Sequence, residues 1–560
     1  MPTLDWIGKK AVVNHHREVP YRLIHCDREL SAGDPDAGNL LVQGDNLEAL
    51  KSLLPYYAGK VKCIYIDPPY NTGNEGWVYN DNVASPEIKA WLGKVVGKEA
   101  EDLSRHDKWL CMMYPRLRLL REFLREDGVI AISISDVEIG NLKLMMNEVF
   151  GEQNYVAEVI VESNARGQTY KAIARTHEYC LIYSRSDSAE LSEISDLDRK
   201  YKFKDDRGGY ELWELRNRNP RFNRGNRPNL FFPFYADPSS FEHDHHRVSL
   251  KRTSDDQIEV FPIDGSGDDD CWRWSEKLIK NKKLSGDDPD LIARQTREGK
   301  WTVWQRARKT TKSAKSILRG SEYLNEAGTT LLTSMDMRAE FDHPKPLGLL
   351  KTIIELSTEE EDLILDSFSG SGTTGHAVLD LNKQDGGRRN FILVEMKEDI
   401  ATKATAKRLG LAIRGYNKNG DKEKPVEPLG GGFRYCRLGT PLFNEFGDID
   451  GGVIFPDLAA HVFFSETGSP LPYKVDGANQ FIGTHKDKAV YLLFSPAEQG
   501  IAREASGNVL TPDALAHLPA PSNDFEGVRV VYAEGCTVSP ERLKASGIVF
   551  KQIPYQIEGS

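Results

Sequence analysis

The chain of 560 residues is too long for one domain of ordinary size, because a typical domain holds roughly 150 residues. Hydrophobic residues make up 39% of it and charged residues 28%, a balance typical of a folded globular protein. No apolar stretch reaches the ~20 residues of a membrane span, and a formal net charge of -11 argues against a protein that coats nucleic acid by bulk charge.

The seven cysteines lie far apart in the sequence and include no CxxC pair. This spacing indicates neither a zinc ribbon nor a disulfide framework, and no histidine cluster has the spacing of a metal site. The N-terminal segment Met1–Trp6 lacks the basic start and apolar core of a signal peptide. We therefore expect reduced thiols, no bound metal, no membrane segment and a cytoplasmic location.

The first 185 residues alternate between helix and strand patterns. Apolar residues recur at helical spacing in some segments, and short apolar runs have the length of buried strands in others. These candidate elements are, in chain order, helix 47–54, strand 61–66, helix 117–124, strand 129–134 and strand 179–183. Because strands that alternate with helices form parallel sheets covered on both faces, residues 1–185 are predicted to form the first half of an α/β domain.

This alternation is interrupted in the middle of the chain. Residues 186–335 are polar, basic and rich in Asn, Asp, Gly and Trp without a clean period, which indicates an inserted domain. Alternation returns over 336–415, the predicted second half of the first domain. Its candidate elements are helix 349–356, strand 363–365, helix 373–381 and strand 391–394. Residues 415–432 are predicted to be a linker or exposed loop, and 433–560 a smaller C-terminal α/β domain with a strand at 489–494.

Two basic runs fall within the predicted insert. Segment 199–227 holds ten lysines and arginines against four acids, and segment 294–319 holds nine against one. Aromatic residues are interleaved in both, a combination typical of surfaces that bind a phosphate backbone. A single basic run is more often a solvent-exposed surface without a ligand. The prediction of phosphate binding therefore depends on the presence of both runs in the same region. The predicted DNA-binding residues are Arg216, Arg218, Arg221, Arg224, Arg306, Arg308 and Lys309.

A glycine-rich loop, Asp366–Thr374, lies between a predicted strand and a predicted helix. Its glycines allow a ligand to approach the backbone closely, and the following helix offers free N–H groups. The next strand ends at Glu395, where a carboxylate can accept hydrogen bonds from both ribose hydroxyls of a nucleoside. The loop has neither a P-loop lysine nor the full GxGxxG spacing, which disfavours ATP and NAD. A plain turn is the alternative for the loop taken alone.

The segment Asp67-Pro68-Pro69-Tyr70 stands at the carboxyl end of a predicted strand, where active sites of α/β proteins lie. A carboxylate and a rigid proline carbonyl can each accept a hydrogen bond from an amino group. The tyrosine offers a face on which a planar base can stack. The alternative is a turn that only ends the strand.

Together these motifs resemble those of the N6-adenine and N4-cytosine DNA methyltransferases. Their order, with Asp67–Tyr70 before a long insert and the glycine loop after it, is similar to the circularly permuted β class. Gly44–Leu47 resembles the acidic motif before the catalytic strand, and His343–Pro346 resembles a further cofactor motif. The string Asp67–Asn80 and the run Arg227–Pro233 look most like the modification subunit of type III restriction–modification systems.

The resemblance implies an α/β fold: a Rossmann-like methyltransferase sheet with a target-recognition domain inserted between its halves and a small C-terminal α/β domain. It also implies S-adenosylmethionine (SAM) as cofactor. Asp45 would contact the adenine ring of SAM, Glu395 the ribose, and Lys345 and Pro346 the methionine end. The residues carried over to the cofactor are Asp45, Lys345, Pro346, Asp366, Phe368, Gly370, Gly372, Thr373 and Glu395.

For the target base, the resemblance implies catalysis by Asp67, Pro68, Pro69 and Tyr70. Tyr70 would stack on a base flipped out of the duplex, because the amino group is unreachable inside the stack. Asp67 and the carbonyl of Pro68 would accept the two amino hydrogens. The amino nitrogen would then attack the sulfonium methyl group directly, without a metal.

Aspartate at position 67 favours adenine, since serine is common there in the N4-cytosine enzymes. N4-cytosine methylation is the first alternative, and a catalytically inactive DNA-binding or assembly subunit is the second. Methylation of RNA or protein is a third. The expected partners are double-stranded DNA, a second copy of the chain in a homodimer, and a restriction or helicase subunit. The C-terminal domain is a candidate for dimerisation or partner docking.

Overall fold

The computed structural model describes residues 4–72, 93, 104–167, 172–196, 199–241, 245–285, 289–444, 447–495, 507–521 and 525–553. The chain forms two compact units. The first consists of Met1–Ser192 with Ala314–Ser560, and the second is Glu193–Ser313. In the part of the chain that the structure describes, no helix has both the length and the apolar character needed to cross a membrane.

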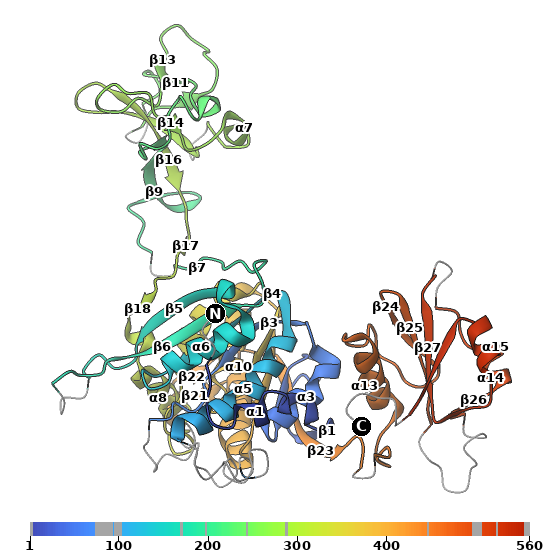
Figure 1. Ribbon diagram of the computed structural model, residues 1–560. Coiled ribbons are helices and arrows are strands. Elements are labelled where there is room, and N and C mark those ends of the chain that lie inside the picture. The colour runs from blue at the N-terminus through green and yellow to red at the C-terminus, as the bar shows by residue number, and fades with distance from the viewer. Residues whose placement is uncertain are drawn as a thin grey trace. The chain divides into compact units, whose positions relative to one another are not determined.

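A ten-stranded sheet forms the centre of the first unit (Figure 1). Its strands, in spatial order, are β1 (Arg22–Gly33), β23 (Gly432–Pro441), β2 (Leu40–Gln43), β20 (Asn390–Glu395), β19 (Leu363–Asp366), β3 (Val61–Ile66), β4 (Leu124–Ile134), β6 (His177–Ser184), β5 (Tyr155–Glu162) and β18 (Ile317–Leu318). The central strands from β2 to β4 pair in parallel, as the alternating pattern predicts. Strand β6 then pairs antiparallel with β4 and with β5.

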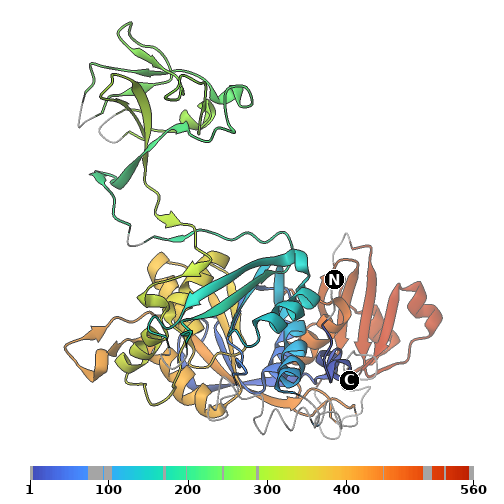
Figure 2. The same ribbon diagram turned by 60° about the vertical axis from the view of Figure 1, so that its left-hand side comes forward.

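Helices cover both faces of this sheet, which Figures 1 and 2 show from two sides. One face packs on α3 (Asn46–Tyr57), α5 (Arg105–Phe123) and α6 (Ile139–Phe150), and the other on α9 (Leu347–Ser357), α10 (Thr373–Asp385) and α12 (Lys407–Arg414). Strand β3 serves both faces, because successive side chains of a strand point to opposite sides. Ile64 and Ile66 enter the first core, and Cys63 and Tyr65 the second.

The two sequence halves of the sheet meet at β3 and β19. These strands are parallel neighbours, with Cys63 opposite Ile364 and Ile64 opposite Leu365. From β3 the sheet continues outward through β4, and from β19 it continues in the other direction through β20 and β2. The strand order therefore reverses at this point, and such reversals leave a crevice at the carboxyl ends of the strands where ligands bind.

Shorter elements complete the first unit around this sheet. They are α1 (Lys9–Val12), α2 (His15–Glu18), α8 (Asn325–Ser334), α11 (Glu398–Ile400), β21 (Tyr416–Asn417) and β22 (Pro425–Val426). The pair β21–β22 shows that the predicted linker 415–432 contains a short hairpin. The C-terminal boundary predicted at residue 433 falls inside β23, a strand of the main sheet.

Beyond β23 the chain forms a smaller sheet of order β24-β25-β27-β29 with helices packed on it. The bounds are α13 (Phe455–Thr467), β24 (Phe481–His485), β25 (Lys488–Leu493), β26 (Val509–Leu510), α14 (Pro512–Ala516), β27 (Val528–Ala533), β28 (Gly535–Cys536), α15 (Pro540–Ala545) and β29 (Ile548–Gln552). Strand β25 matches the strand predicted at 489–494. Tyr21 and Leu23 from the N-terminal segment join the apolar core of this sheet.

Cys26 and Cys436 form a disulfide, so the prediction that all seven cysteines are reduced thiols is wrong for this pair. They lie directly opposite each other on β1 and β23, with Cα atoms 3.8 Å apart. The two positions are 410 residues apart in the chain, and sequence spacing carries no sign of such a cross-strand pair. Cys63, Cys111, Cys180, Cys271 and Cys536 are free.

The second unit is built almost entirely from short strands (Figure 1). Its elements are β7 (Ile194–Ser195), β8 (Phe203–Asp205), β9 (Gly208–Glu214), β10 (Arg216–Asn217), β11 (Phe234–Ala236), β12 (Val248–Ser249), β13 (Ile258–Val260), β14 (Cys271–Trp272), α7 (Glu276–Ile279), β15 (Leu291–Gln295), β16 (Trp301–Ala307) and β17 (Thr311–Lys312). The unit is shorter than the predicted insert 186–335, because β18 and α8 belong to the first unit.

Candidate active site

The turn after β3 is held rigidly by its surroundings. Two prolines end the strand, since proline lacks the N–H that would continue the ladder. The indole Nε1 of Trp109 donates a hydrogen bond of 2.7 Å to the carbonyl of Pro69. Asn71, the residue after Tyr70, has a φ of 55° and is buried, and its Nδ2 donates to Glu138. These contacts fix the direction in which Asp67 and Tyr70 project.

Asp67 is enclosed, with a side chain only 11% exposed. Its Oδ1 lies 3.4 Å from Lys345 Nζ in an ion pair but accepts no hydrogen bond from the residues that the structure describes. Burial raises the pKa of Asp67 to about 6, an effect that the positive charge of Lys345 opposes and the negative charge of Glu178 reinforces. Above that pH the site presents an ionised acceptor with unused hydrogen-bonding capacity.

Tyr70 is fixed by Glu178 and Lys345. Its hydroxyl donates to Glu178 Oε2 at 3.1 Å and accepts from Lys345 Nζ at 2.5 Å. The same ammonium donates to both oxygens of Glu178, at 3.0 Å and 2.9 Å, and lies 4.6 Å from the centre of the Tyr70 ring. Lys345, predicted to border the cofactor, therefore also contacts the turn Asp67–Tyr70. Sequence reasoning missed Glu178, which stands near the start of β6; its acidic side chain in an otherwise apolar strand is the one available signal.

The glycine loop after β19 adopts a conformation that its glycines make accessible. Gly370 and Gly372 have φ values of 50° and 76°. A Cβ atom at Gly372 would lie 2.9 Å from Cγ2 of Thr405, so a larger residue would not fit without movement. Asp366 holds the start of the loop by accepting from the backbone N–H of Phe368 and from the hydroxyl of Thr374. Burial raises the pKa of Asp366 to about 7.

One pocket is lined by residues of both the Asp67–Tyr70 turn and the glycine loop. Its lining residues are Tyr65, Asp67, Phe341, His343, Lys345, Leu350, Asp366, Phe368, Ser369, Gly370, Ser371, Thr373 and Thr374. Six predicted site residues are in this group: Asp67, Lys345, Asp366, Phe368, Gly370 and Thr373. The pocket thus lies at the reversal of strand order between β3 and β19.

Seven other predicted site residues lie outside the lining of this pocket: Pro68, Pro69, Tyr70, Asp45, Pro346, Gly372 and Glu395. Asp45 caps α3 by accepting from the N–H groups of Leu47 and Glu48. Glu395 accepts from the backbone N–H groups of Gly370 and Lys397, and so supports the glycine loop from behind. Residues 73–80, the remainder of the string that begins at Asp67, lie outside the described residues.

In the second unit, six of the seven predicted DNA-binding residues form ion pairs with described residues: Arg216, Arg218, Arg224, Arg306, Arg308 and Lys309. Arg306 is 2% exposed, and its guanidinium pairs with Asp205 and bonds to His245. Arg308 pairs with the same Asp205, and Lys309 pairs with Glu193. A buried, paired guanidinium is not available to a phosphate, so the structure assigns Arg306 to the interior of the unit. The sequence shows the charges of the run 294–319 but not their partners, so the burial of Arg306 could not be predicted from it.

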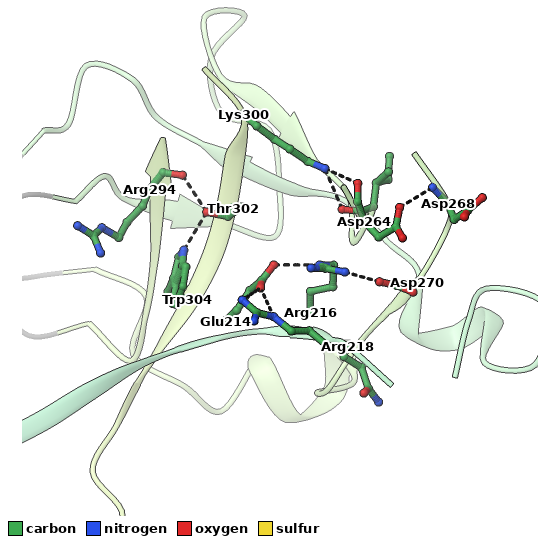
Figure 3. A network of polar contacts seen from close by, with 12 residues as sticks. Glu214, Arg216, Arg218, Asp264, Asp268, Asp270, Arg294, Lys300, Thr302 and Trp304 are labelled. Carbon is green, nitrogen blue, oxygen red and sulfur yellow. Dashed lines mark hydrogen bonds and ion pairs between the residues drawn. The ribbon is translucent and has the colours of Figure 1, made fainter. Parts of the chain in front are cut away.

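The arginine side chains of the first basic run, 199–227, include several that are more exposed than Arg306 and Arg308. Glu214 forms ion pairs with both Arg216 and Arg218, and Arg216 also pairs with Asp270 (Figure 3). The side chain of Arg218 is 68% exposed and that of Arg224 is 60% exposed. Arg221 is exposed as well.

Beside these arginines lies a hollow with two indole rings. It is lined by Leu212, Trp213, Glu214, Arg216, Arg218, Arg273 and Trp304. Trp304 stands on β16 and donates to the hydroxyl of Thr302 (Figure 3). The guanidinium of Arg273 lies 5.7 Å from the ring of Trp213. Cationic and aromatic groups thus share one face.

Comparison with known proteins identifies the family. The model of a family described as DNA methylase matches residues 61–407. The type III restriction–modification enzyme EcoPI Mod subunit of Escherichia phage P1 is 34% identical over 435 residues, 73% of this chain and 65% of that protein. The type II methyltransferase M.KpnI of Klebsiella pneumoniae is 33% identical over 376 residues, 67% of this chain and 84% of that protein.

Among solved structures, the chain is similar to the M1.HpyAVI–SAM complex, with 13% identity, a TM-score of 0.28, and coverage of 66% of this chain and all of that one. The cytosine-N4-specific PvuII DNA methyltransferase has 11% identity and a TM-score of 0.33, with coverage of 67% and 89%. Because the matched region is more than half of the chain and contains both motifs, the protein belongs to the DNA methylase family, whose members are SAM-dependent DNA methyltransferases.

Proposed function

We propose that this protein is a site-specific DNA methyltransferase that transfers the methyl group of SAM to the N6 amine of a flipped adenine, as the modification subunit of a restriction–modification system. The single observation that carries the proposal is the pocket in which the enclosed carboxylate of Asp67 faces the glycine loop that begins at Asp366. Both motifs stand at the ends of adjacent parallel strands.

At the base, Asp67 and the carbonyl of Pro68 accept the two amino hydrogens, and the ring of Tyr70 stacks on the flipped base. Hydrogen bonds from the amine to these acceptors favour a lone pair localised on nitrogen rather than delocalised into the ring. When the nitrogen acquires the methyl group, it must lose one proton. Asp67, with a pKa raised to about 6, is placed to accept that proton at neutral pH and to release it to water afterwards.

The residues around the pocket fit SAM. The left-handed backbone at Gly370 and Gly372 permits close approach of a ligand, and the N-terminal turn of α10 follows at once. When bound, SAM supplies an electrophilic methyl group on its sulfonium. We assign its binding to Asp366, Phe368, Gly370, Gly372 and Thr373, with Lys345 and Pro346 bordering the methionine end, Glu395 near the ribose and Asp45 near the adenine ring.

Adenine is the proposed target because residue 67 is aspartate and because the relatives include the Mod subunits of EcoPI and EcoP15I. N4-cytosine methylation is the competing assignment, since both bases carry an exocyclic amine. Incubation of the protein with SAM and DNA, hydrolysis to nucleosides and mass spectrometry distinguish the two. We expect N6-methyldeoxyadenosine; N4-methyldeoxycytidine would refute the assignment of the base, and no methylation of any DNA would refute the function.

For DNA binding we propose the second unit, Glu193–Ser313, as the target-recognition domain. The exposed Arg218, Arg221 and Arg224 are assigned to phosphates, and the hollow between Trp213 and Trp304 is assigned to the same face. We further propose that the protein acts as a homodimer and associates with a restriction subunit, and that the C-terminal α/β part contributes to docking. Sedimentation with and without DNA measures whether the protein is a homodimer. Co-purification with a co-expressed restriction subunit measures whether the two proteins associate.

A further inference from the structure

Arg408 on α12 is a buried cation without an anionic partner. The residue is 0% exposed, and no carboxylate within the described residues forms an ion pair with it. Burial lowers the pKa of its guanidinium to about 9, so it stays charged at neutral pH. An uncompensated buried charge is costly and is retained where an opposite charge completes the site.

The hydrogen bonds of Arg408 lead to the glycine loop. Its Nη1 donates to the hydroxyl of Ser371 at 2.9 Å and to that of Thr373 at 2.8 Å. Its Nε donates to Nδ1 of His376, which burial keeps neutral by lowering its pKa well below the usual value. Nη2 is buried and has no hydrogen-bond partner among the described residues.

Ser371 and Thr373 both line the pocket that holds Asp67. Because their oxygens accept from Arg408, their hydroxyl hydrogens must point elsewhere. The hydroxyl of Thr373 donates to the backbone carbonyl of Lys345 at 3.3 Å. The oxygen of Ser371 lies 3.3 Å from that of Thr373, so the Ser371 hydroxyl can donate its hydrogen either to Thr373 or, when an acceptor is bound, into the pocket. The positive charge of Arg408, on the side of the glycine loop away from the pocket, thus favours the binding of an anion in the pocket.

We propose that Arg408 is a positioning residue that selects the carboxylate of the methionine moiety of SAM, acting through Ser371 and Thr373. This inference rests on the proposed function in one respect, namely that the pocket takes SAM. The carboxylate is the only anionic group of that cofactor, and it is the one chemical feature that a cation behind the loop can distinguish. Arg408 itself does not line the pocket, so its effect is exerted through the two hydroxyl groups.

Binding of SAM and of decarboxylated SAM to the purified full-length protein, measured by calorimetry, tests this inference. The two ligands differ by the carboxylate alone. We expect the unmodified protein to prefer SAM by about tenfold or more, as charge-assisted hydrogen bonds imply. In Arg408→Gln the affinity for SAM should fall, so that the ratio of the affinities for SAM and decarboxylated SAM approaches one. The affinity for decarboxylated SAM should stay within about twofold of that of the unmodified protein.

Three variants guard against a purely structural effect. Arg389→Gln removes another buried guanidinium, one that pairs with Asp385 at 2.7 Å away from the pocket, and should leave the preference unchanged. Arg408→Lys retains the charge and should restore part of the preference. Ser371→Ala keeps Arg408 in place and should weaken SAM more than decarboxylated SAM, so the inference stays testable even if Arg408→Gln does not fold.

The outcomes separate the inference from the proposed function. A parallel loss of affinity for both ligands in Arg408→Gln, or an undiminished preference in both Arg408→Gln and Ser371→Ala, would show that Arg408 only supports the loop and would overturn the inference. If the unmodified protein binds neither ligand, the assignment of SAM to this pocket is itself wrong, and the role of Arg408 is refuted with it.

Discussion

Lys345 Nζ lies 2.9 Å from Glu178 Oε2 and 3.4 Å from Asp67 Oδ1, so one buried ammonium group is shared by two carboxylates. Glu178 and Asp67 come from strands of the first sequence half, whereas Lys345 precedes α9 in the second half. The turn Asp67–Tyr70 is therefore contacted by a residue 278 positions away from Asp67 in the chain. An ion pair of this kind couples the charge of the acceptor to the placement of Lys345.

Removal of the Asp67 carboxylate should separate catalysis from cofactor binding. We expect Asp67→Ala to lower the rate of methyl transfer by at least about a hundredfold, because positioned proton acceptors contribute factors of this size. Its affinity for SAM, measured by calorimetry, should stay within about threefold, because Asp67 is assigned to the base. A loss of SAM affinity as large as the loss of rate would contradict that assignment.

The rate should depend on pH through Asp67. Its pKa is raised to about 6, so kcat/KM for DNA at saturating SAM should fall as the pH drops through that value and the carboxylate is protonated. Lys345→Met removes the positive charge that opposes this rise, so the fall should begin at a higher pH. Lys351→Met is the matched control, since that lysine pairs with Asp380 on α10. An acid limb that does not move in Lys345→Met would exclude Lys345 as the charge partner.

Glu178 should position Tyr70. Glu178→Gln weakens the contacts with Lys345 and the tyrosine hydroxyl, and we expect a loss of about 1–3 kcal/mol in transition-state stabilisation, the usual effect of disrupting a hydrogen bond to a charged group. Tyr70→Phe keeps the stacking face and should lose less than Tyr70→Ala. Single-turnover rates measure all three variants. Equal rates for Tyr70→Phe and Tyr70→Ala would argue against stacking.

His461 should make the stability of the protein depend on pH. The side chain is buried against Tyr21, neither ring nitrogen has a hydrogen-bond partner in the described part of the chain, and burial lowers its pKa to about 3. Below pH 6.5 the unfolded chain takes up a proton that the folded protein excludes. The free energy of unfolding should therefore fall as the pH drops from about 6.5 toward 3, by about 2 kcal/mol at pH 5.

Urea unfolding of His461→Leu at pH 7 and pH 5 measures this contribution. The variant should lose about 2 kcal/mol less than the unmodified protein between these two pH values. The exposed His517 provides the control, and His517→Gln should behave like the unmodified protein. An identical pH dependence in His461→Leu would show that other groups cause the acid instability.

Salt dependence should distinguish the two basic runs. Replacing Arg218, Arg221 and Arg224 by alanine should weaken binding to all DNA sequences and flatten the plot of log affinity against log salt by about one unit per lost phosphate contact. Replacing Arg306 and Arg308 by alanine should leave that slope unchanged, because both side chains are largely buried and paired with Asp205. The reverse result would return the DNA contact to the second run.

Local patterns were sufficient for much of the fold. The strand predicted at 61–66 and the helix predicted from Thr373 match β3 and α10, because apolar period and turn residues are local properties. The bound predicted at residue 433 lies within β23, and the sequence gives no local sign of this because β23 joins the main sheet through pairing with the distant strands β1 and β2. In the candidate site, too, residues within local motifs could be predicted and residues that depend on distant contacts could not. Asp67 and Gly370 lie within short motifs, whereas Glu178 and Arg408 act through residues distant in sequence.

The two ends of the second unit lie on neighbouring short strands. Strands β7 and β17 pair antiparallel there, with Ser195 opposite Thr311 and Ile194 opposite Lys312, so the chain leaves and returns side by side. A segment whose two ends are adjacent can be replaced by a segment of another length without changing the fold of the surrounding domain. Insertions are therefore tolerated at such places. If the second unit is the target-recognition domain, as proposed above, its exchange by recombination would change the DNA sequence that the enzyme recognises in a single step and would leave the residues of the methyl-transfer site unaltered.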